Sequence, residues 1–435
     1  RSTLFPYTTL FRSRTGQTPH ARGRFEGQIT PLDEPAWGFN GELNMRASQA
    51  ATALSMLRLS PGGTPVTGAI DLKASISKSA AKYQLGNLSL NIGGETVRGT
   101  AEVDVAGDRP AAKLDIQAAS VALPKIAAYL IDWDRQDLTS QFADVASGGE
   151  SLWPNKAFLL TALQAGDGTL QIKAPAIWLS DDIKLGDARL EASLKSGTLT
   201  LSKLQGQLYG GAFSGSGALK LLQGRAGFDA KVKLGNFDLA ALSKAQGGTK
   251  LADGNADFEM TLEGQGLSPR GILTVLSGSG ELKLTKGKIY GLSPAALKAA
   301  GDTYLNQEIP DKAQLTAKLD GDFRKGSLPF EQITIPVVVK DGVLRVADVE
   351  FRGPDYKASA GAIVDLASFR LDSEWDVSYL GKASDGQPLP SVRLAFAGPV
   401  AQFSSLRPQL DADQFERYLS IKRIDRDMDK LENRF

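Results

Sequence analysis

Few residues of this 435-residue chain could carry catalysis. It has one histidine, His20, and no cysteine, so neither a Ser-His-Asp triad, a Cys-His pair nor a histidine-rich metal site can be assembled from it. The carboxylates at Asp181-Asp182 and at 425–429 suit a calcium or glycosidase site, but a solvated turn and a solvated helix face explain them more simply. The sequence therefore favours a non-enzymatic protein that uses no metal and no cofactor.

The sequence also lacks the usual motifs for binding phosphate groups or nucleic acid. The chain contains no GxxxxGK[ST] motif, and strand patterns rather than helix starts follow Gly210-Gly211 and Gly278–Gly280, which argues against a phosphate cradle. Basic and acidic residues nearly cancel, 50 against 49, without a dense Lys/Arg block. Nucleic acid is therefore not expected as a partner.

The clearest structural unit is Thr198–Ala245. Two runs of alternating apolar and polar residues are joined by Gln223-Gly224, which predicts a β-hairpin with one apolar face. A short helix over Leu239–Ala245, with Asp238 as its N-cap, follows the hairpin. The same alternation continues further along the chain and assigns ten large side chains to one apolar face: Phe213, Leu219, Leu221, Phe228, Val232, Leu234, Phe258, Met260, Leu282 and Leu284.

That face has two interpretations. Its side chains either pack on each other as a dry core or line a groove for an apolar ligand, and the residues alone favour the dry core. Gly215 and Gly217, on the same side of the strand, either let the sheet bend or leave room for a ligand near the backbone. Bending is the simpler explanation.

The rest of the chain repeats this pattern of short strands, glycine turns and short helices. We expect helices over Met45–Leu59, Val121–Ile131 and Ser293–Gln307, a strand at Leu315–Leu319, and a hairpin turn at Asp341-Gly342. The predicted fold class is mostly β: one long curled antiparallel sheet, an open β-trough or repeating β-groove, with short interspersed helices and a C-terminal helix.

Five segments are expected. Residues 1–13 resemble a translated sequencing adapter and are treated as non-native. Residues 14–135 form a first β segment, 136–156 a linker or insertion, 157–410 the main β region, and 411–435 an amphipathic helix. The chain shows neither a run of about 18 apolar residues nor a signal-peptide pattern at its start.

The C-terminal helix is predicted to begin near Ala412. Ile421, Ile424, Met428, Leu431 and Phe435 recur at three- and four-residue spacing, which gives it an apolar stripe. This stripe either caps the end of the sheet or docks a partner, and we expect Ile424 and Met428 to make the contact.

Two stretches resemble the AsmA family. The run LADGNADFEMTLEGQGLSPRGILTVLSGSGELKLTKGKIYGLSPAALKAA, at 251–300, resembles the family's hallmark segment, in which a glycine-serine strand pair leads to "GxIxGL" and a helix. LQGQLYGGAFSGSGALKL, at 204–221, resembles the family's strand pair with a Tyr-Gly-Gly turn. The resemblance extends over most of 47–399. Family members carry an N-terminal inner-membrane helix and a first β segment that are not seen here, so we expect a truncated C-terminal portion.

The resemblance implies a Gram-negative envelope protein that is anchored in the inner membrane, lies in the periplasm and supports outer-membrane biogenesis. Larger relatives of the TamB and YhdP type resemble bridge-like lipid-transfer proteins, which shifts the expectation from a dry core to a lipid-lined groove. A chain of about 16 carbons would gain on the order of 10 kcal/mol there, at about 0.8 kcal/mol per methylene. The implied partners are a phospholipid or other acyl-chain lipid and, through the missing N-terminal anchor, the inner membrane. The alternative function is assembly of outer-membrane proteins by strand addition at a sheet edge.

Overall fold

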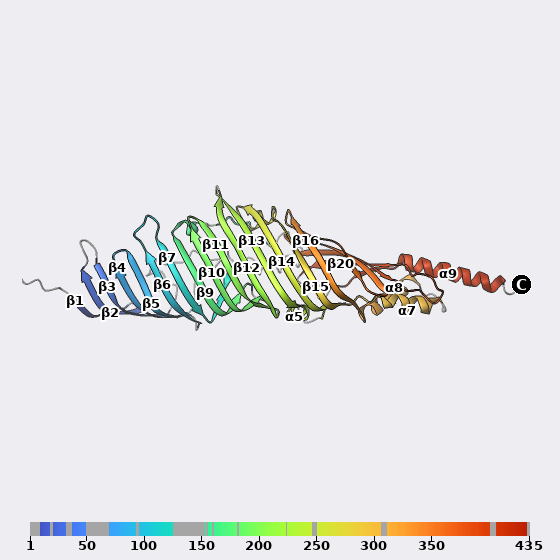
Figure 1. The fold of residues 1–435 in the computed structure, drawn as a ribbon, viewed down its shortest axis with the longest axis horizontal. Helices are drawn as coiled ribbons and strands as arrows, with labels where there is room; N and C mark the ends of the chain where they lie inside the picture. Colours follow the sequence, from blue (N-terminus) through green and yellow to red (C-terminus); the bar gives the residue numbers. More distant parts are fainter. Residues whose placement is uncertain are drawn as a thin grey trace, which may run out of the picture.

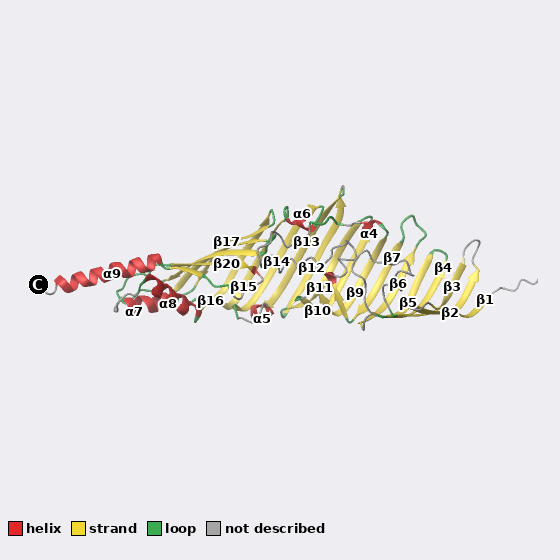
Figure 2. Ribbon diagram, turned by 180° about the vertical axis from the view of Figure 1, so that it is seen from behind, coloured by secondary structure: helices red, strands yellow, loops and turns green. Residues whose placement is uncertain are grey.

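The protein forms one elongated sheet with helices along its margins and at its C-terminal end (Figures 1 and 2). The computed structural model describes residues 9–17, 21–31, 37–48, 69–92, 95–124, 153, 155–158, 161–180, 182–222, 224–245, 250–305, 311–400 and 406–432. The strands are β1 (Thr9–Gln17), β2 (Ala21–Pro31), β3 (Trp37–Ala47), β4 (Ile70–Ser79), β5 (Lys82–Ile92), β6 (Glu95–Asp104), β7 (Ala111–Ala118), β8 (Ser120–Ala122), β9 (Asp167–Trp178), β10 (Lys184–Lys195), β11 (Thr198–Leu208), β12 (Gly211–Leu222), β13 (Arg225–Asp238), β14 (Ala252–Gly266), β15 (Ser277–Tyr290), β16 (Ser327–Lys340), β17 (Val343–Arg352), β18 (Tyr356–Asp365), β19 (Arg370–Tyr379), β20 (Val392–Pro399) and β21 (Gln409–Asp411). The helices are α4 (Thr161–Gln164), α5 (Leu239–Ala245), α6 (Pro269–Leu273), α7 (Ala295–Tyr304), α8 (Lys312–Arg324) and α9 (Asp413–Glu432).

Strand pairing follows the chain almost throughout. From β1 to β7 and from β9 to β21, each strand pairs antiparallel with the next one, as the predicted meander requires. The exception lies at β9, which pairs in parallel with both β7 and β8. Parallel neighbours require a long crossover connection, and the chain between 123 and 166 provides it. The predicted linker at 136–156 falls within this crossover, mostly outside the described residues.

Several hairpins close through two-residue turns with positive φ at both positions. At the predicted turn, Asp341 and Gly342 have φ values of 52° and 73°. Tyr209 and Gly210, between β11 and β12, show the same pattern with 51° and 79°. Turns of this kind match the right-handed twist of the flanking strands and therefore fix their register.

One predicted strand is wrong, because Leu315–Leu319 belongs to helix α8. Leu315, Leu319 and Phe323 are four residues apart and fully buried on one side of that helix. Asp311 caps its first turn by accepting a hydrogen bond from the backbone N–H of Gln314 at 2.8 Å. Leu315, Ala317 and Leu319 fit a strand period as well as a helix period, and the cap and Phe323 decide between the two.

The other helices agree only partly with expectation. Helix α5 has the predicted bounds, and α7 lies within Ser293–Gln307. Of the helix predicted over Met45–Leu59, Met45–Ala47 belongs to β3 and 49–59 lies outside the described residues. The helix predicted over Val121–Ile131 begins as strand β8, and 125–131 is not described. Residues 9–13, in the stretch treated as non-native, belong to β1.

A dense core forms where the sheet ends. Strand β17 pairs with β16 through four residue pairs, Val337–Lys340 with Val343–Val346, and then continues as the partner of β18. Helices α7 and α8 pack on each other beside this part of the sheet, with α7 in contact with β19 and α8 in contact with β21. Side chains of both helices, of α9 and of the neighbouring strands are fully buried there: Leu297, Leu315, Leu319, Phe323, Leu328, Leu394, Phe415 and Leu419.

Helix α9 begins at Asp413, close to the predicted start, and its free end points away from the sheet (Figure 1). Phe415 and Leu419 in its first turns are fully buried, whereas Ile424 and Met428 are 57% and 55% exposed. The expectation that Ile424 and Met428 make the capping contact is therefore wrong within this chain. Phe415 and Leu419 make that contact because they lie on the opposite side of the helix.

A polar cluster also holds α9 against the loop before β20. The Asp385 carboxylate accepts a hydrogen bond from the Tyr418 hydroxyl at 2.9 Å and lies 3.2 Å from the Lys422 ammonium group. Burial opposes ionisation of Asp385, but hydrogen bonds from the Gln387 backbone, Tyr418 and Lys422 outweigh it, so the pKa of Asp385 is lowered. Burial has the larger effect on Tyr418, and together with the Asp385 carboxylate it raises the pKa of Tyr418 to about 12. The docked helix therefore depends on a charged Asp385 and a neutral Tyr418.

We expect acid to weaken this docking. A lowered carboxyl pKa contributes stability above the ordinary aspartate value, and that contribution is lost as the pH falls through the folded-state pKa. The raised Tyr418 pKa contributes stability below the ordinary tyrosine value and is lost as the pH rises through about 12. Calorimetric Tm values of the wild type and of Asp385→Asn at pH 7 and pH 3 test the predicted loss of stability in acid. Wild type should lose more Tm than the variant, and an equal loss would contradict this role of Asp385.

Candidate functional site

The ten predicted apolar side chains lie on one side of strands β12–β15, and the same side of β11 and β16 extends it. We call this side of β11–β16 the apolar face. In the β12–β13 hairpin, Phe213 is paired with Leu234, Gly215 with Val232, and Leu219 with Phe228. Residues directly opposite each other in a sheet point to the same face, so the predicted register is confirmed.

Pairing continues this face across the next strands. Leu234 is paired with Phe258, Phe258 with Leu282, and Leu282 with Ile335 on β16. A second row runs from Val232 through Met260 and Gly280 to Val337. The apolar face is therefore a continuous surface across neighbouring strands.

Burial differs along this face. Of the ten predicted residues, Leu234, Met260 and Leu284 are buried, whereas the others are half-buried: Phe213, Leu219, Leu221, Phe228, Val232, Phe258 and Leu282. Leu234 and Leu284 belong to the main core, and Met260 belongs to a separate cluster with Val337 and Val339. Large apolar side chains between the two clusters thus retain part of their accessible surface.

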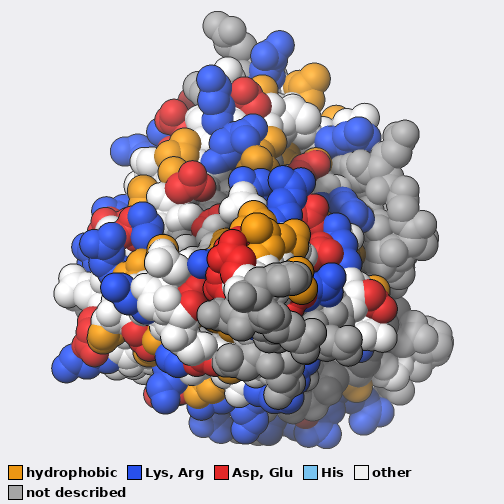
Figure 3. Space-filling model, turned by 90° about the vertical axis from the view of Figure 1, so that its right-hand side faces the viewer, with side chains coloured by type: hydrophobic (Ala, Val, Ile, Leu, Met, Phe, Trp, Pro, Cys, Tyr) orange, Lys and Arg blue, Asp and Glu red, His pale blue; other side chains and the backbone are white. Residues whose placement is uncertain are grey.

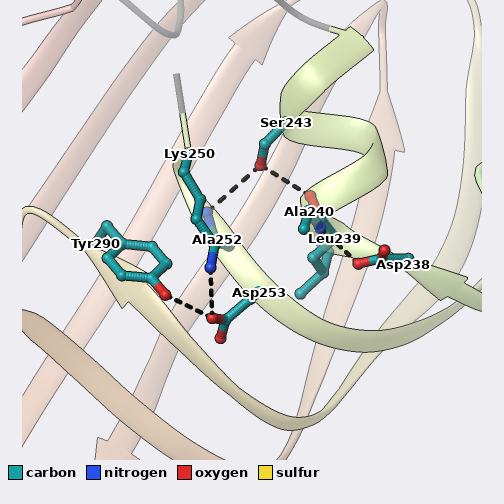
Figure 4. Close-up of polar contacts among 8 residues, drawn as sticks. All are labelled: Asp238, Leu239, Ala240, Ser243, Lys250, Ala252, Asp253 and Tyr290. Carbon is teal, nitrogen blue, oxygen red and sulfur yellow. Dashed lines mark hydrogen bonds and ion pairs between the residues drawn. The ribbon is translucent and has the colours of Figure 1, made fainter. Parts of the chain in front are cut away.

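A polar cluster lies beside α5, where β14 begins and β15 ends (Figure 4). Asp238 caps α5 by accepting a hydrogen bond from the backbone N–H of Ala240 at 2.8 Å, which confirms the predicted cap. The Ser243 hydroxyl donates to the Leu239 carbonyl at 2.8 Å and ties α5 to the start of β14. Figure 4 shows Lys250 and Tyr290 converging on Asp253 beside this helix.

Ionic and hydrogen-bonding contacts fix that cluster. The Tyr290 hydroxyl donates to Asp253 at 2.5 Å, and the Lys250 ammonium group lies 3.1 Å from the same carboxylate. The hydrogen bond from Tyr290 lowers the pKa of Asp253, and Lys250 adds to this effect against the opposing effect of burial. A charged Asp253 therefore holds β14 and β15 together where α5 packs.

One end of the face is covered by α6 and by the end of the crossover. Leu273 and Leu276 pack against Met260, and Ser268 caps α6 by accepting a hydrogen bond from the Gly271 N–H at 3.1 Å. Trp153 packs on the same cluster and donates through its indole N–H to the Leu366 carbonyl at 2.8 Å. This crossover residue thus connects the apolar face to the β18–β19 turn.

Glycines on the face let neighbouring backbones approach closely. A Cβ placed on Gly217 would lie 2.5 Å from the Asp229 carbonyl oxygen, and one on Gly280 would lie 2.3 Å from that of Glu259. A Cβ on Gly215 would make only ordinary contacts, with the Phe213 ring at 3.4 Å. Close approach of the neighbouring strand therefore requires glycine at 217, whereas position 215 has room for a Cβ.

The other side of the same strands is polar. Lys231 pairs with Glu259 at 2.6 Å and Lys283 with Glu281 at 2.6 Å, both well exposed to solvent. An open hollow of ≈ 950 Å³ also crosses β11–β16, lined by three consecutive residues from each strand, such as 216–218 and 277–279. Its lining includes Leu201, Leu262 and Val339, which lie on the apolar face. The accessible surface of this hollow is more apolar than polar.

The described residues show no cluster of three or more His, Cys, Asp or Glu side chains that could hold a metal ion. His20 and Asp181 lie outside the described residues, and the carboxylates at 425–429 lie on helix α9. Gly210-Gly211 belongs to the β11–β12 hairpin and Gly278–Gly280 to the interior of β15, so neither opens a helix.

Sequence reasoning missed part of the apolar face. Leu201, Leu262 and Val339 share one row across the sheet with Gly217 and Gly278. Their period-two alternation would have identified them, since the strands themselves were expected. The contacts that Leu273, Leu276 and Trp153 make with this face could not be predicted, because no local sequence pattern indicates them.

Comparison with protein families gave one finding. The model of the AsmA family matches residues 67–349, which include β4–β16 and therefore the whole apolar face. Searches of curated proteins and of solved structures gave no match. Among the described residues, no helix combines the length and the hydropathy that a bilayer crossing needs. AsmA proteins are a family of bacterial envelope proteins, generally without enzymatic activity. Because the match covers more than half of the sequence, this chain belongs to the AsmA family.

Proposed function

We propose that this protein binds the acyl chains of a phospholipid or a similar lipid on its apolar face and supports outer-membrane biogenesis. The supporting observation is the set of half-buried large apolar side chains on this face between two buried clusters, including Phe213, Phe228 and Val232. Apolar surface left accessible on a continuous face typically marks a binding site.

Energetics are compatible with this function. At roughly 25 cal/mol per Å² of apolar surface removed from water, an acyl chain and the side chains it covers both gain free energy without any polar recognition site. The row from Phe213 through Leu234, Phe258 and Leu282 to Ile335 crosses β12–β16, so a chain can shift along it with little change in contacts. Such a surface suits holding or passing lipids rather than chemical conversion.

Cellular location forms part of the same proposal. A periplasmic position next to the inner membrane of a Gram-negative cell rests on membership in an envelope protein family. The alternative, assembly of outer-membrane proteins by strand addition, has less support at the C-terminal end of the sheet. There the last strand, β21, has three residues, and α9 contacts β20 beside it.

Extraction of the purified protein with organic solvent, followed by mass spectrometry, tests this function. Protein prepared without detergent should release phospholipid or fatty acid in an amount comparable to the protein, and it should bind a fluorescent phospholipid analogue. If no lipid is released and the analogue does not bind, the apolar face is a dry core and the proposal is wrong.

A further inference from the structure

Helix α9 carries two functional sides along its length. Phe415, Leu419, Lys422 and Arg426 follow each other at four-, three- and four-residue spacing and therefore lie on one side. Phe415 and Leu419 are buried, Lys422 lies 3.2 Å from Asp385, and Arg426 donates through Nη1 to the Leu305 carbonyl at 2.7 Å. This side attaches the helix to the body of the protein.

The opposite side is an exposed apolar stripe. Ile421, Ile424, Met428 and Leu431 recur at three-, four- and three-residue spacing, and each is 55% to 58% exposed. At 1.5 Å per residue the stripe is about 15 Å long. Figures 1 and 2 show this part of α9 projecting beyond the sheet, where no other described element covers it. Contiguous exposed apolar side chains of this kind mark an interaction surface.

Charge decides which partner fits. In a heptad that places the stripe at positions a and d, Asp425 and Glu432 occupy e and Asp427 occupies g. Asp429 adds a further acidic side chain next to the Asp425 edge. In the end-on view of Figure 3, hydrophobic side chains lie directly beside acidic ones at this end of the molecule. The apolar stripe thus has acidic residues at its borders.

We propose that the distal half of α9 docks a basic amphipathic helix of another protein. Such a helix would place apolar side chains on the stripe and Lys or Arg side chains opposite Asp425, Asp427 and Glu432. A second copy of this chain fits less well. In an antiparallel pair the e positions would set Asp425 against Glu432, and in a parallel pair Asp427 would face Glu432. The same acidic borders would repel an anionic membrane surface.

Fluorescence anisotropy with designed peptides tests this docking on the full chain. The probe is a fluorescein-labelled helical peptide of about three heptads with Leu at a and d and Lys at e and g. A matched peptide carries Glu at e and g. The Lys peptide should bind at least about tenfold more tightly than the Glu peptide, because attraction replaces repulsion at several positions.

Three variants locate the contact. Ile424→Ser combined with Met428→Ser should abolish binding of the Lys peptide. Leu380→Ser, which removes an apolar side chain of similar exposure elsewhere, should leave binding unchanged. Asp425→Lys combined with Glu432→Lys should reverse the preference and select the Glu peptide. All of these positions are exposed, so the variants are expected to fold.

Several results would overturn the proposal. Equal binding of both peptides, or binding of neither, would exclude a basic helix as the partner of the stripe. Light scattering that shows dimers of the wild type but monomers of the Ile424→Ser and Met428→Ser double variant would assign the stripe to a second copy. Co-flotation with vesicles containing phosphatidylglycerol, lost in the same double variant, would assign it to a membrane.

Discussion

Replacing Val232 by glutamate is expected to reduce the lipid that co-purifies with the protein at least about tenfold, since an ionised carboxylate in contact with an acyl chain costs more than about 1.4 kcal/mol. Val232 is half-buried in the middle of the apolar face, paired with Gly215 and Met260. Its partial exposure lets the new carboxylate reach water in the lipid-free protein. The variant should therefore lose lipid before it loses its fold.

Solvent extraction with mass spectrometry gives the lipid content, and circular dichroism with a thermal scan gives the fold. Leu219→Glu places a second carboxylate on the same face and should act in the same way. Gln205→Glu adds the same charge to an exposed position on the polar side of β11 and should leave both lipid content and Tm unchanged. Global unfolding by Val232→Glu and Leu219→Glu, with no lipid on the wild type, would support a dry core.

The second large effect concerns the attachment of α9. Phe415→Ala should destabilise the C-terminal core by about 3–5 kcal/mol, because it removes a fully buried aromatic side chain and leaves a cavity. Denaturant unfolding measures this change. Hydrogen exchange should also show that α9 loses its protection while β11–β15 keep theirs, since Phe415 contributes to the C-terminal end of the core.

Ile424→Ala on the same helix is the matched control. Ile424 is 57% exposed, so its truncation should change the free energy of unfolding by less than about 0.5 kcal/mol. A loss of similar size for the two variants would contradict the division of α9 into a docked half and an exposed half.

Local periodicity accounts for what could be predicted. Alternation from Phe213 to Leu234 was sufficient to assign the strands, their common face and their register, because side chains in a strand point to opposite faces with period two. The turn residues Asp341 and Gly342 added the hairpin between β16 and β17. Most of the predicted apolar face followed in the same way, since each member lies in a strand with a clean pattern.

Predictions failed where two local patterns competed or where contacts were distant in sequence. Leu315, Ala317 and Leu319 suited a strand as well as a helix, and the helix forms because Leu315, Leu319 and Phe323 are buried together. Trp153 reaches the Leu366 carbonyl from more than 200 residues away, a contact that no local pattern signals.

By itself, then, the sequence determined a mostly β chain with one-faced strands, fixed hairpin registers and a C-terminal helix, since each depends on spacing within a few residues. Tertiary structure alone decided the rest: the parallel pairing of β7 with β9, the helix at 312–324, and which ends of the apolar face are covered. It also decided which side of α9 is buried. One side of this helix carries Phe415 and Leu419, and the other carries Ile424 and Met428, so both sides are apolar. Only the positions of Asp385, Leu305 and the neighbouring core select the side that docks.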